Sequence, residues 1–198
     1  RDRSPSRGLG DVYKRQGAFM KNMQDAEKLA EEMVKIGSLA GRNTIAVISD
    51  MDEPLGLAVG NALEVAEAVK TLKKEGPEDL INLCLELGTQ MLIASKVEEN
   101  ADKARGMLQN SIDDGSAYNK FLEFIKRQGG DITVFDDLDE FTECNYKIEV
   151  KADKEGYVQR IESELIGEAS MILGGGRMTK EDVIDYSCLL YTSPSPRD

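Results

Sequence analysis

The residues best placed to do chemistry in this sequence lie in and just after one loop, between residues 50 and 67. The loop follows an apolar, β-branched run, Thr44–Ile48, and leads into a stretch of helix-forming residues that begins near Gly60. A strand, a loop that contains Pro and Gly, and then a helix N-terminus is where α/β proteins usually place a ligand. We therefore expect a functional site of this chain to be built on this loop.

Three acidic side chains, Asp50, Asp52 and Glu53, cluster at the start of the loop. Together they could bind a metal ion or act as a general acid or base. A solvated acidic loop that also caps the following helix explains them as well, and we favour that simpler interpretation.

A second candidate set consists of Leu55, Ala58 and Glu67. A loop around Leu55 can turn backbone carbonyl groups inward, and Glu67, about two turns into the helix, could add a carboxylate. Carbonyl and carboxylate oxygens suit a weakly held hard cation. From spacing alone, however, packing roles for Leu55 and Ala58 and a surface position for Glu67 are the simpler interpretation.

The composition excludes several classes of function. The chain has 25 basic and 37 acidic residues, a net charge of −12, which argues against binding to a nucleic-acid backbone. It has no histidine, which excludes Ser-His-Asp and Cys-His catalysis within these residues. No apolar run approaches the roughly 20 residues needed to cross a membrane. Cys84 and Cys144 show neither disulfide nor metal spacing, as expected in the cytoplasm.

Both ends of the sequence are predicted to be foreign to the protein. One codon choice for residues 188–198 has a reverse complement that encodes residues 6–16 in another frame. Two unrelated peptides should not be antisense to each other, so we interpret both as a translated sequencing adapter. We therefore treat residues 1–16 and 188–198 as non-native tails and exclude them from reasoning about the fold.

The first part of the remaining sequence, residues 17–130, predicts a helix-rich α/β domain. The run Asn43–Ser49 is wholly apolar in its middle, as strands buried on both faces of a parallel sheet are. Phe121, Phe124 and Ile125 are expected in the core rather than on a base-stacking surface. Helices are predicted from Asn22 to Ile36, from Ala62 to Lys73, from Pro77 to Ser95, and after N-caps at Asn100 and Ser116.

The second part predicts a smaller α+β unit. Residues 131–145 are acidic and irregular and are interpreted as a connector. Residues 146–187 follow, with a β-hairpin made of Tyr146–Ala152 and Tyr157–Ile161. A short helix then runs from Ser163 to Leu173, and Gly174–Arg177 is interpreted as its C-terminal loop, since it lacks the pattern of a phosphate-binding loop.

An ordered set of short motifs carries a resemblance to a known family. The motifs lie at Gly17–Lys21, Gly41–Met51, Pro54–Gly56, Gly60–Val65, Gly76–Leu80, Gln128–Asp131, Leu173–Arg177 and Thr179–Asp182. In this order and spacing the set resembles the pyrimidine-nucleoside phosphorylases, which include the thymidine phosphorylases, over essentially the whole stretch from Gly17 to Ser187.

The resemblance implies an enzyme that cleaves uridine or thymidine with inorganic phosphate to give the base and a pentose 1-phosphate. It implies the α/β fold class: the C-terminal part of a mixed α/β phosphorylase domain, followed by a truncated α+β domain. It also implies a homodimer and a bound potassium ion, whose ligands would include Leu55, Ala58 and Glu67. Phe19 falls at a wall of the family's base pocket, although an ordinary core role for Phe19 stays equally open.

The same resemblance places the family's phosphate-binding and base-binding residues before Gly17. We therefore assign no catalytic residue and expect the polypeptide as written to be inactive. Two alternatives stay open: a related phosphorylase or phosphoribosyltransferase, and a non-enzymatic carrier with Lys154 at the hairpin tip. Anthranilate phosphoribosyltransferase lacks the C-terminal α+β module, and a carrier lysine would need a flanking Met that Lys154 does not have.

Overall fold

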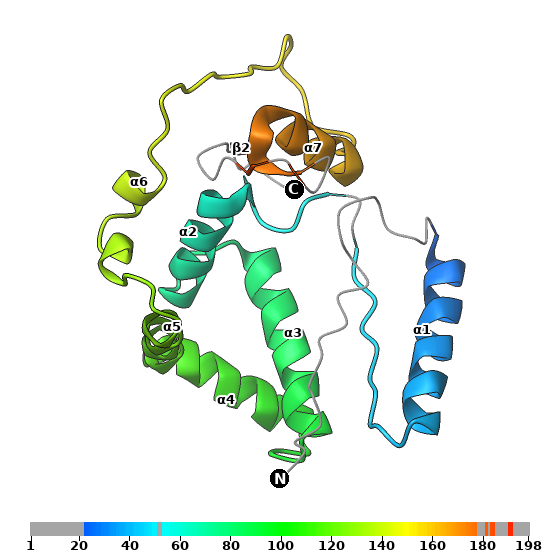
Figure 1. Cartoon of the computed structure of the whole chain (residues 1–198). Coiled ribbons are helices and arrows are strands. Elements are labelled where there is room, and N and C mark those ends of the chain that lie inside the picture. Colours follow the sequence, from blue (N-terminus) through cyan, green and yellow to red (C-terminus); the bar gives the residue numbers. More distant parts are fainter. Residues whose placement is uncertain (1–21, 51–52, 178–180, 182, 185–189, 192–198) are drawn as a thin grey trace.

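The computed structural model describes residues 22–50, 53–177, 181, 183–184 and 190–191. These residues form a helix-rich chain with a small two-stranded sheet, which fits the expected α/β class (Figure 1). In chain order the elements are α1 (Met23–Leu39), β1 (Ala58–Val59), α2 (Asn61–Leu72), α3 (Glu78–Ala94), α4 (Ala101–Asp113), α5 (Ser116–Arg127), η1 (Thr133–Phe135), α6 (Leu138–Phe141), α7 (Ser163–Ser170), η2 (Met171–Gly175) and β2 (Leu190–Tyr191).

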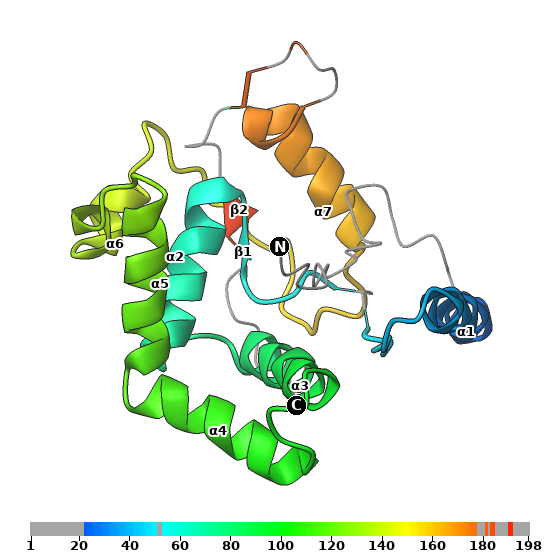
Figure 2. The same cartoon turned by 60° about the horizontal axis from the view of Figure 1, so that its bottom comes forward.

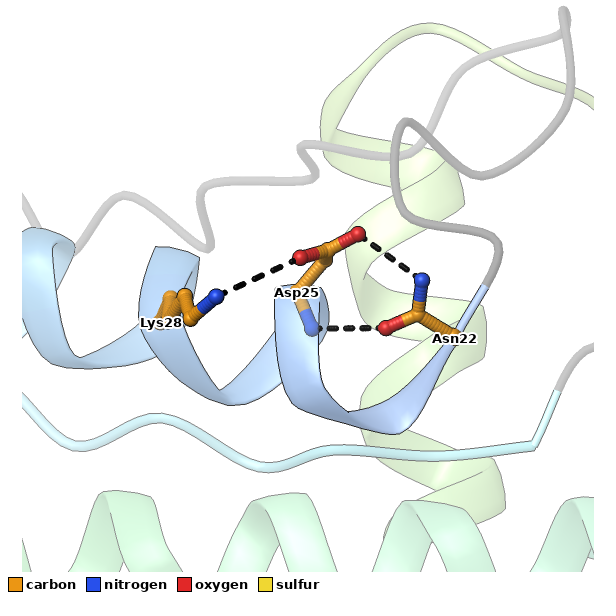
Figure 3. Close-up of polar contacts among 3 residues, drawn as sticks. All are labelled: Asn22, Asp25 and Lys28. Atoms are coloured by element: carbon orange, nitrogen blue, oxygen red, sulfur yellow. Dashed lines mark hydrogen bonds and ion pairs between the residues drawn. The ribbon is translucent and has the colours of Figure 1, made fainter.

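Helix α1 confirms the first predicted helix. Asn22 caps it: its side-chain oxygen accepts from the Asp25 amide at 2.9 Å, and its Nδ2 donates to the Asp25 carboxylate at 2.8 Å (Figure 3). Lys28 lies 3.7 Å from the same carboxylate. Helix α1 lies apart from the other helices in both views (Figures 1 and 2), and none of its residues is buried.

The predicted buried strand at Asn43–Ser49 is wrong in this structure. The segment runs without assigned secondary structure from α1 toward β1, and Ile45, Val47 and Ile48 stay 36–42% exposed. A strand of a parallel sheet exists only when neighbouring strands satisfy its amide and carbonyl groups. None of the described residues pairs with this segment.

Helices α2 to α5 confirm the four predicted helices of the first part. They are linked by short turns, with α3 packed on α4 and α4 on α5 (Figure 2). Asn100 caps α4 through its side-chain oxygen, which accepts from the Lys103 amide at 2.9 Å. The predicted cap at Ser116 is displaced by one residue, because Gly115, with φ 77°, takes that position.

The described core is small and is centred on α2 and an aromatic group around Phe135. Val69 is fully buried, and the Phe135 ring lies 5.2 Å from the Phe121 ring and 5.6 Å from the Phe141 ring, centroid to centroid. Phe124, in contrast, is 57% exposed, which corrects its expected core position. The acidic connector is therefore less irregular than predicted, since η1 and α6 pack Phe135 and Phe141 within it.

The predicted hairpin is also wrong. Residues 142–162 trace an extended path around the outside of the molecule (Figure 1), and the two arms form no strands. The alternating apolar residues Tyr146, Ile148 and Val150 are 86–94% exposed. A lone hairpin is marginally stable without a covered apolar face, and no described element covers this one. Lys154 therefore has no hairpin tip to occupy, which removes the structural support for a carrier.

The C-terminal elements return to the loop that carries the candidate site. Helix α7 continues into the wider turns of η2, where Gly174, with φ 105°, leaves the helical conformation, as expected near a helix C-terminus. Strand β2 pairs antiparallel with β1, Ala58 opposite Tyr191 and Val59 opposite Leu190. The two residues of β2, Leu190 and Tyr191, lie in the segment predicted to be non-native, and that origin stays a prediction. Among the described residues, no helix is long and apolar enough to span a membrane.

Candidate functional site

The loop from residue 53 to Gly60 is held by three carboxylates. Asp79 accepts a hydrogen bond from the Gly56 amide at 2.9 Å, and Glu64 accepts one from the Gly60 amide at 3.0 Å. Glu67 accepts one from the Leu57 amide at 2.9 Å. Glu64 and Glu67 lie on α2 and Asp79 lies in the first turn of α3, so two helices fix the path of one loop.

Glu67 is the chemically unusual member of this set. It is 9% exposed, and this burial raises the pKa of its carboxyl group. Hydrogen bonds from the Leu57 and Ala58 amides lower that pKa, while the nearby Asp79 and Glu64 charges raise it further. The ion pairs found in the described part of the chain do not include Glu67. A buried carboxylate next to two other acids is a site where a bound cation would lower the electrostatic energy.

Gly56 makes the close approach of Glu67 possible. Its backbone has φ 71°, in the left-handed region that side chains disfavour. A Cβ atom placed on Gly56 would lie 2.3 Å from Oε2 of Glu67. The Pro-Leu-Gly turn thus leaves a space that the carboxylate fills.

The structure brings two of the three predicted cation ligands together: the Ala58 amide donates a hydrogen bond to the Glu67 carboxylate. Glu67 lies against the loop between Leu55 and Ala58, because its hydrogen-bond partner is Leu57. Ala58 is buried at 5% exposure, whereas the Leu55 side chain is 45% exposed, as a residue that contributes only its carbonyl group could be. The residues present fit an oxygen-ligated cation, since the buried carboxylate supplies charge and the loop supplies backbone groups.

The other sequence-predicted site residues are exposed, half-buried or outside the described residues. Asp50 is exposed and Glu53 is half-buried, while Asp52 lies outside the described residues. Within the described residues there is no cluster of three or more His, Cys, Asp or Glu side chains suited to a metal ion. Phe19, the predicted wall of a base pocket, also lies outside the described residues.

A cavity of about 210 Å³ lies beside Glu67. It is smaller than the roughly 300 Å³ at which sites for drug-sized ligands begin, so this cavity does not by itself hold a nucleoside. Its lining comes from the loop and β1, α2, the turn before α3, α6 and β2, namely Leu57, Ala58, Leu63, Ala66, Glu67, Lys70, Glu75, Gly76, Pro77, Leu138, Thr142 and Tyr191.

Sequence reasoning missed two of the carboxylates that hold the loop. Glu64 carried a local signal, because an acid in the first turn of a helix can reach back to the capping residue. Asp79 carries a misleading signal: an acid in the first turn of a helix suggests a role at the start of α3, but its partner Gly56 lies 23 residues away. No local pattern reveals a contact of that span.

Comparison with known proteins places the chain in a family. Residues 6–118 match the glycosyl transferase family, a/b domain, and residues 157–191 match the pyrimidine nucleoside phosphorylase C-terminal domain. Both matches extend into the segments predicted to be non-native.

Relatives from Staphylococcus aureus are named pyrimidine-nucleoside phosphorylase. The protein of strain bovine RF122 / ET3-1 is 54% identical over 177 residues, which is 89% of this chain and 41% of the relative. The proteins of strains USA300 and NCTC 8325 / PS 47 are 53% identical over the same shares. The chain thus spans less than half the length of these relatives. It belongs to the glycosyl transferase family with this a/b domain, and the relatives that it resembles are named pyrimidine-nucleoside phosphorylase.

Proposed function

We propose that this chain is part of an enzyme that cleaves pyrimidine nucleosides with inorganic phosphate, giving the free base and a pentose 1-phosphate. The observation that carries the proposal is the 54% identity over 89% of the chain to a protein named pyrimidine-nucleoside phosphorylase. The separate match of residues 157–191 to the pyrimidine nucleoside phosphorylase C-terminal domain favours this activity over phosphoribosyl transfer. By the same resemblance we propose a cytoplasmic homodimer.

A chimera tests this activity with the chain's own residues. The matching 177 residues of the Staphylococcus aureus relative would be replaced by those of this chain. We expect the chimera to release uracil from uridine, or thymine from thymidine, only when phosphate is present. A folded chimera without this activity, next to an active parent, would contradict the proposal.

We further propose that Leu55, Ala58 and Glu67 contribute to a potassium site. The support is the buried Glu67 carboxylate, which has acidic neighbours and hydrogen bonds to the loop between the other two residues. A bound potassium ion would supply the positive charge that this group lacks. The chain's own part is to hold the carboxylate and the loop at a fixed separation, and so to brace the entry to α2.

The potassium proposal predicts a cation-specific gain in stability. At ten times its Kd, a ligand that binds only the folded chain stabilises it by about 1.4 kcal/mol. For a chain of this size that raises Tm by about 3–5 °C. We expect this rise in KCl compared with choline chloride at equal ionic strength, measured by thermal unfolding.

The variant Glu67→Gln keeps an acceptor for the Leu57 amide but removes the charge, so its Tm should be the same in both salts. Glu31→Gln, on the exposed surface of α1, removes one charge elsewhere and should respond as the wild-type chain does. An equal potassium response in Glu67→Gln would refute the assignment.

A further inference from the structure

We propose that Asp79 is a positioning residue for the cation site: it fixes the loop between Leu55 and Ala58 by accepting the hydrogen bond from the Gly56 amide. The inference rests on the potassium site proposed above, and it assigns to Asp79 a task beyond starting helix α3. Asp79 would act through the loop and would not touch the cation.

The geometry behind the proposal is a clamp on two successive amides. The Gly56 amide donates to Oδ2 of Asp79 at 2.9 Å, and the Leu57 amide donates to Oε1 of Glu67 at 2.9 Å. Asp79 comes from α3 and Glu67 from α2, so the two acceptors approach the loop from different elements. With both amides held, the two peptide units that follow Leu55 have little freedom to rotate.

The loop also has little space beside Glu67. Because a Cβ atom on Gly56 would lie 2.3 Å from Oε2 of Glu67, the Gly56 backbone and this carboxylate are already in close contact. Gly56, which lacks a side chain, could adopt many conformations if its amide were released. Loss of the Asp79 bond would therefore change the separation of Glu67 from the loop carbonyl groups, on which the affinity of an oxygen-ligated cation depends.

A simpler role for Asp79 makes a different prediction. Glu78 and Asp79 both lie in the first turn of α3, where negative charge interacts favourably with the helix N-terminus. That role needs the charge, whereas the clamp needs an acceptor atom in the right place. Asn at position 79 keeps an acceptor and loses the charge, and Ala loses both, so the two substitutions separate the roles.

The test is a potassium titration of the full 198-residue chain, with Tm measured in KCl and choline chloride mixtures of constant ionic strength. We expect Asp79→Ala to raise the half-saturating potassium concentration about tenfold, equivalent to about 1.4 kcal/mol. Asp79→Asn should stay within about twofold of the wild-type value. Glu78→Ala controls for the loss of an acid from the same turn and should leave the value unchanged.

Hydrogen exchange of the Gly56 amide, followed by NMR without potassium, gives a second readout. We expect protection of this amide to fall in Asp79→Ala and to persist in Asp79→Asn. A wild-type chain that shows no potassium response would overturn the cation site and this inference together. A normal wild-type response that is unchanged in Asp79→Ala, or equally weakened in both Asp79 variants, would overturn this inference alone.

Discussion

Gly56 is the residue on which the geometry of the candidate site depends most directly. It combines a left-handed backbone, a hydrogen bond to Asp79 and close contact with the Glu67 carboxylate. Each of these properties alone could tolerate a small side chain with some adjustment. All three act on the same few atoms, so no small shift of the backbone could accommodate a methyl group added at Gly56.

Replacing Gly56 with Ala should therefore destabilise the chain by about 2–3 kcal/mol, the cost of backbone strain combined with a steric clash. Denaturant-induced unfolding would measure this change. Gly106 is the matched control, because it lies within α4 and a Cβ atom there would meet nothing within 4 Å. Gly106→Ala should leave stability unchanged or raise it by up to about 1 kcal/mol, and a similar loss in both variants would contradict this account.

At the scale of the elements, helix α2 joins the candidate site to the core. One turn carries the Glu67 carboxylate and the next buries Val69 and Thr71, whose hydroxyl donates to the Glu67 carbonyl at 2.8 Å. The end of α2 then meets the aromatic group, where Lys73 lies 4.9 Å from the Tyr118 ring centroid. The position of Glu67 thus depends on how firmly α2 is packed.

The aromatic group should supply much of that firmness. Phe135 is 4% exposed, so Phe135→Ala should cost about 3–4 kcal/mol of unfolding free energy. Phe124→Ala removes the same atoms from a side chain that is 57% exposed and should cost less than about 1 kcal/mol. Denaturant-induced unfolding of both variants would check the difference, and equal losses would show that Phe135 is not part of a packed core.

The elements also show what local sequence signals can predict. Asn22 and Asn100 cap their helices within one turn, Pro77 marks the start of α3, and all three helices begin within a few residues of the predicted positions. The predictions of a strand at Asn43–Ser49 and of the two hairpin arms were wrong, because a strand depends on pairing with another segment and not on local signals alone. Apolar, β-branched residues indicate only that a segment suits a sheet. Among the described residues no strand pairs with residues 43–49, and the two hairpin arms do not pair with each other.

The residues of the candidate site also differ in how far local sequence signals can predict them. Leu55, Ala58 and Glu67 were candidates because they share one loop and the helix that follows it, and the family resemblance rather than their spacing favoured them as cation ligands. Asp79 could not, because its contact with Gly56 depends on the turn that folds α3 back toward the loop. Candidate residues close together in the sequence can be named from it, while a contact made by packing between helices, such as that of Asp79 with Gly56, cannot.

For the molecule as a whole, the dominant electrostatic fact is a net charge of −12. Any salt screens this repulsion and is expected to stabilise the folded chain to some extent. A potassium effect is therefore informative only when it is measured against another cation at the same ionic strength.

The hydrogen bond between Gly56 and Asp79 has a consequence for how the molecule opens. It joins two residues that are 23 positions apart, and the segment between them includes all of α2 and the turn that follows it. The conformation of the loop is therefore conditional on the pairing of two helices, and any fluctuation that moves the start of α3 away from the loop releases the Gly56 amide to solvent. The hydrogen-exchange rate of the Gly56 amide therefore measures how often this whole segment opens, that is, its local unfolding.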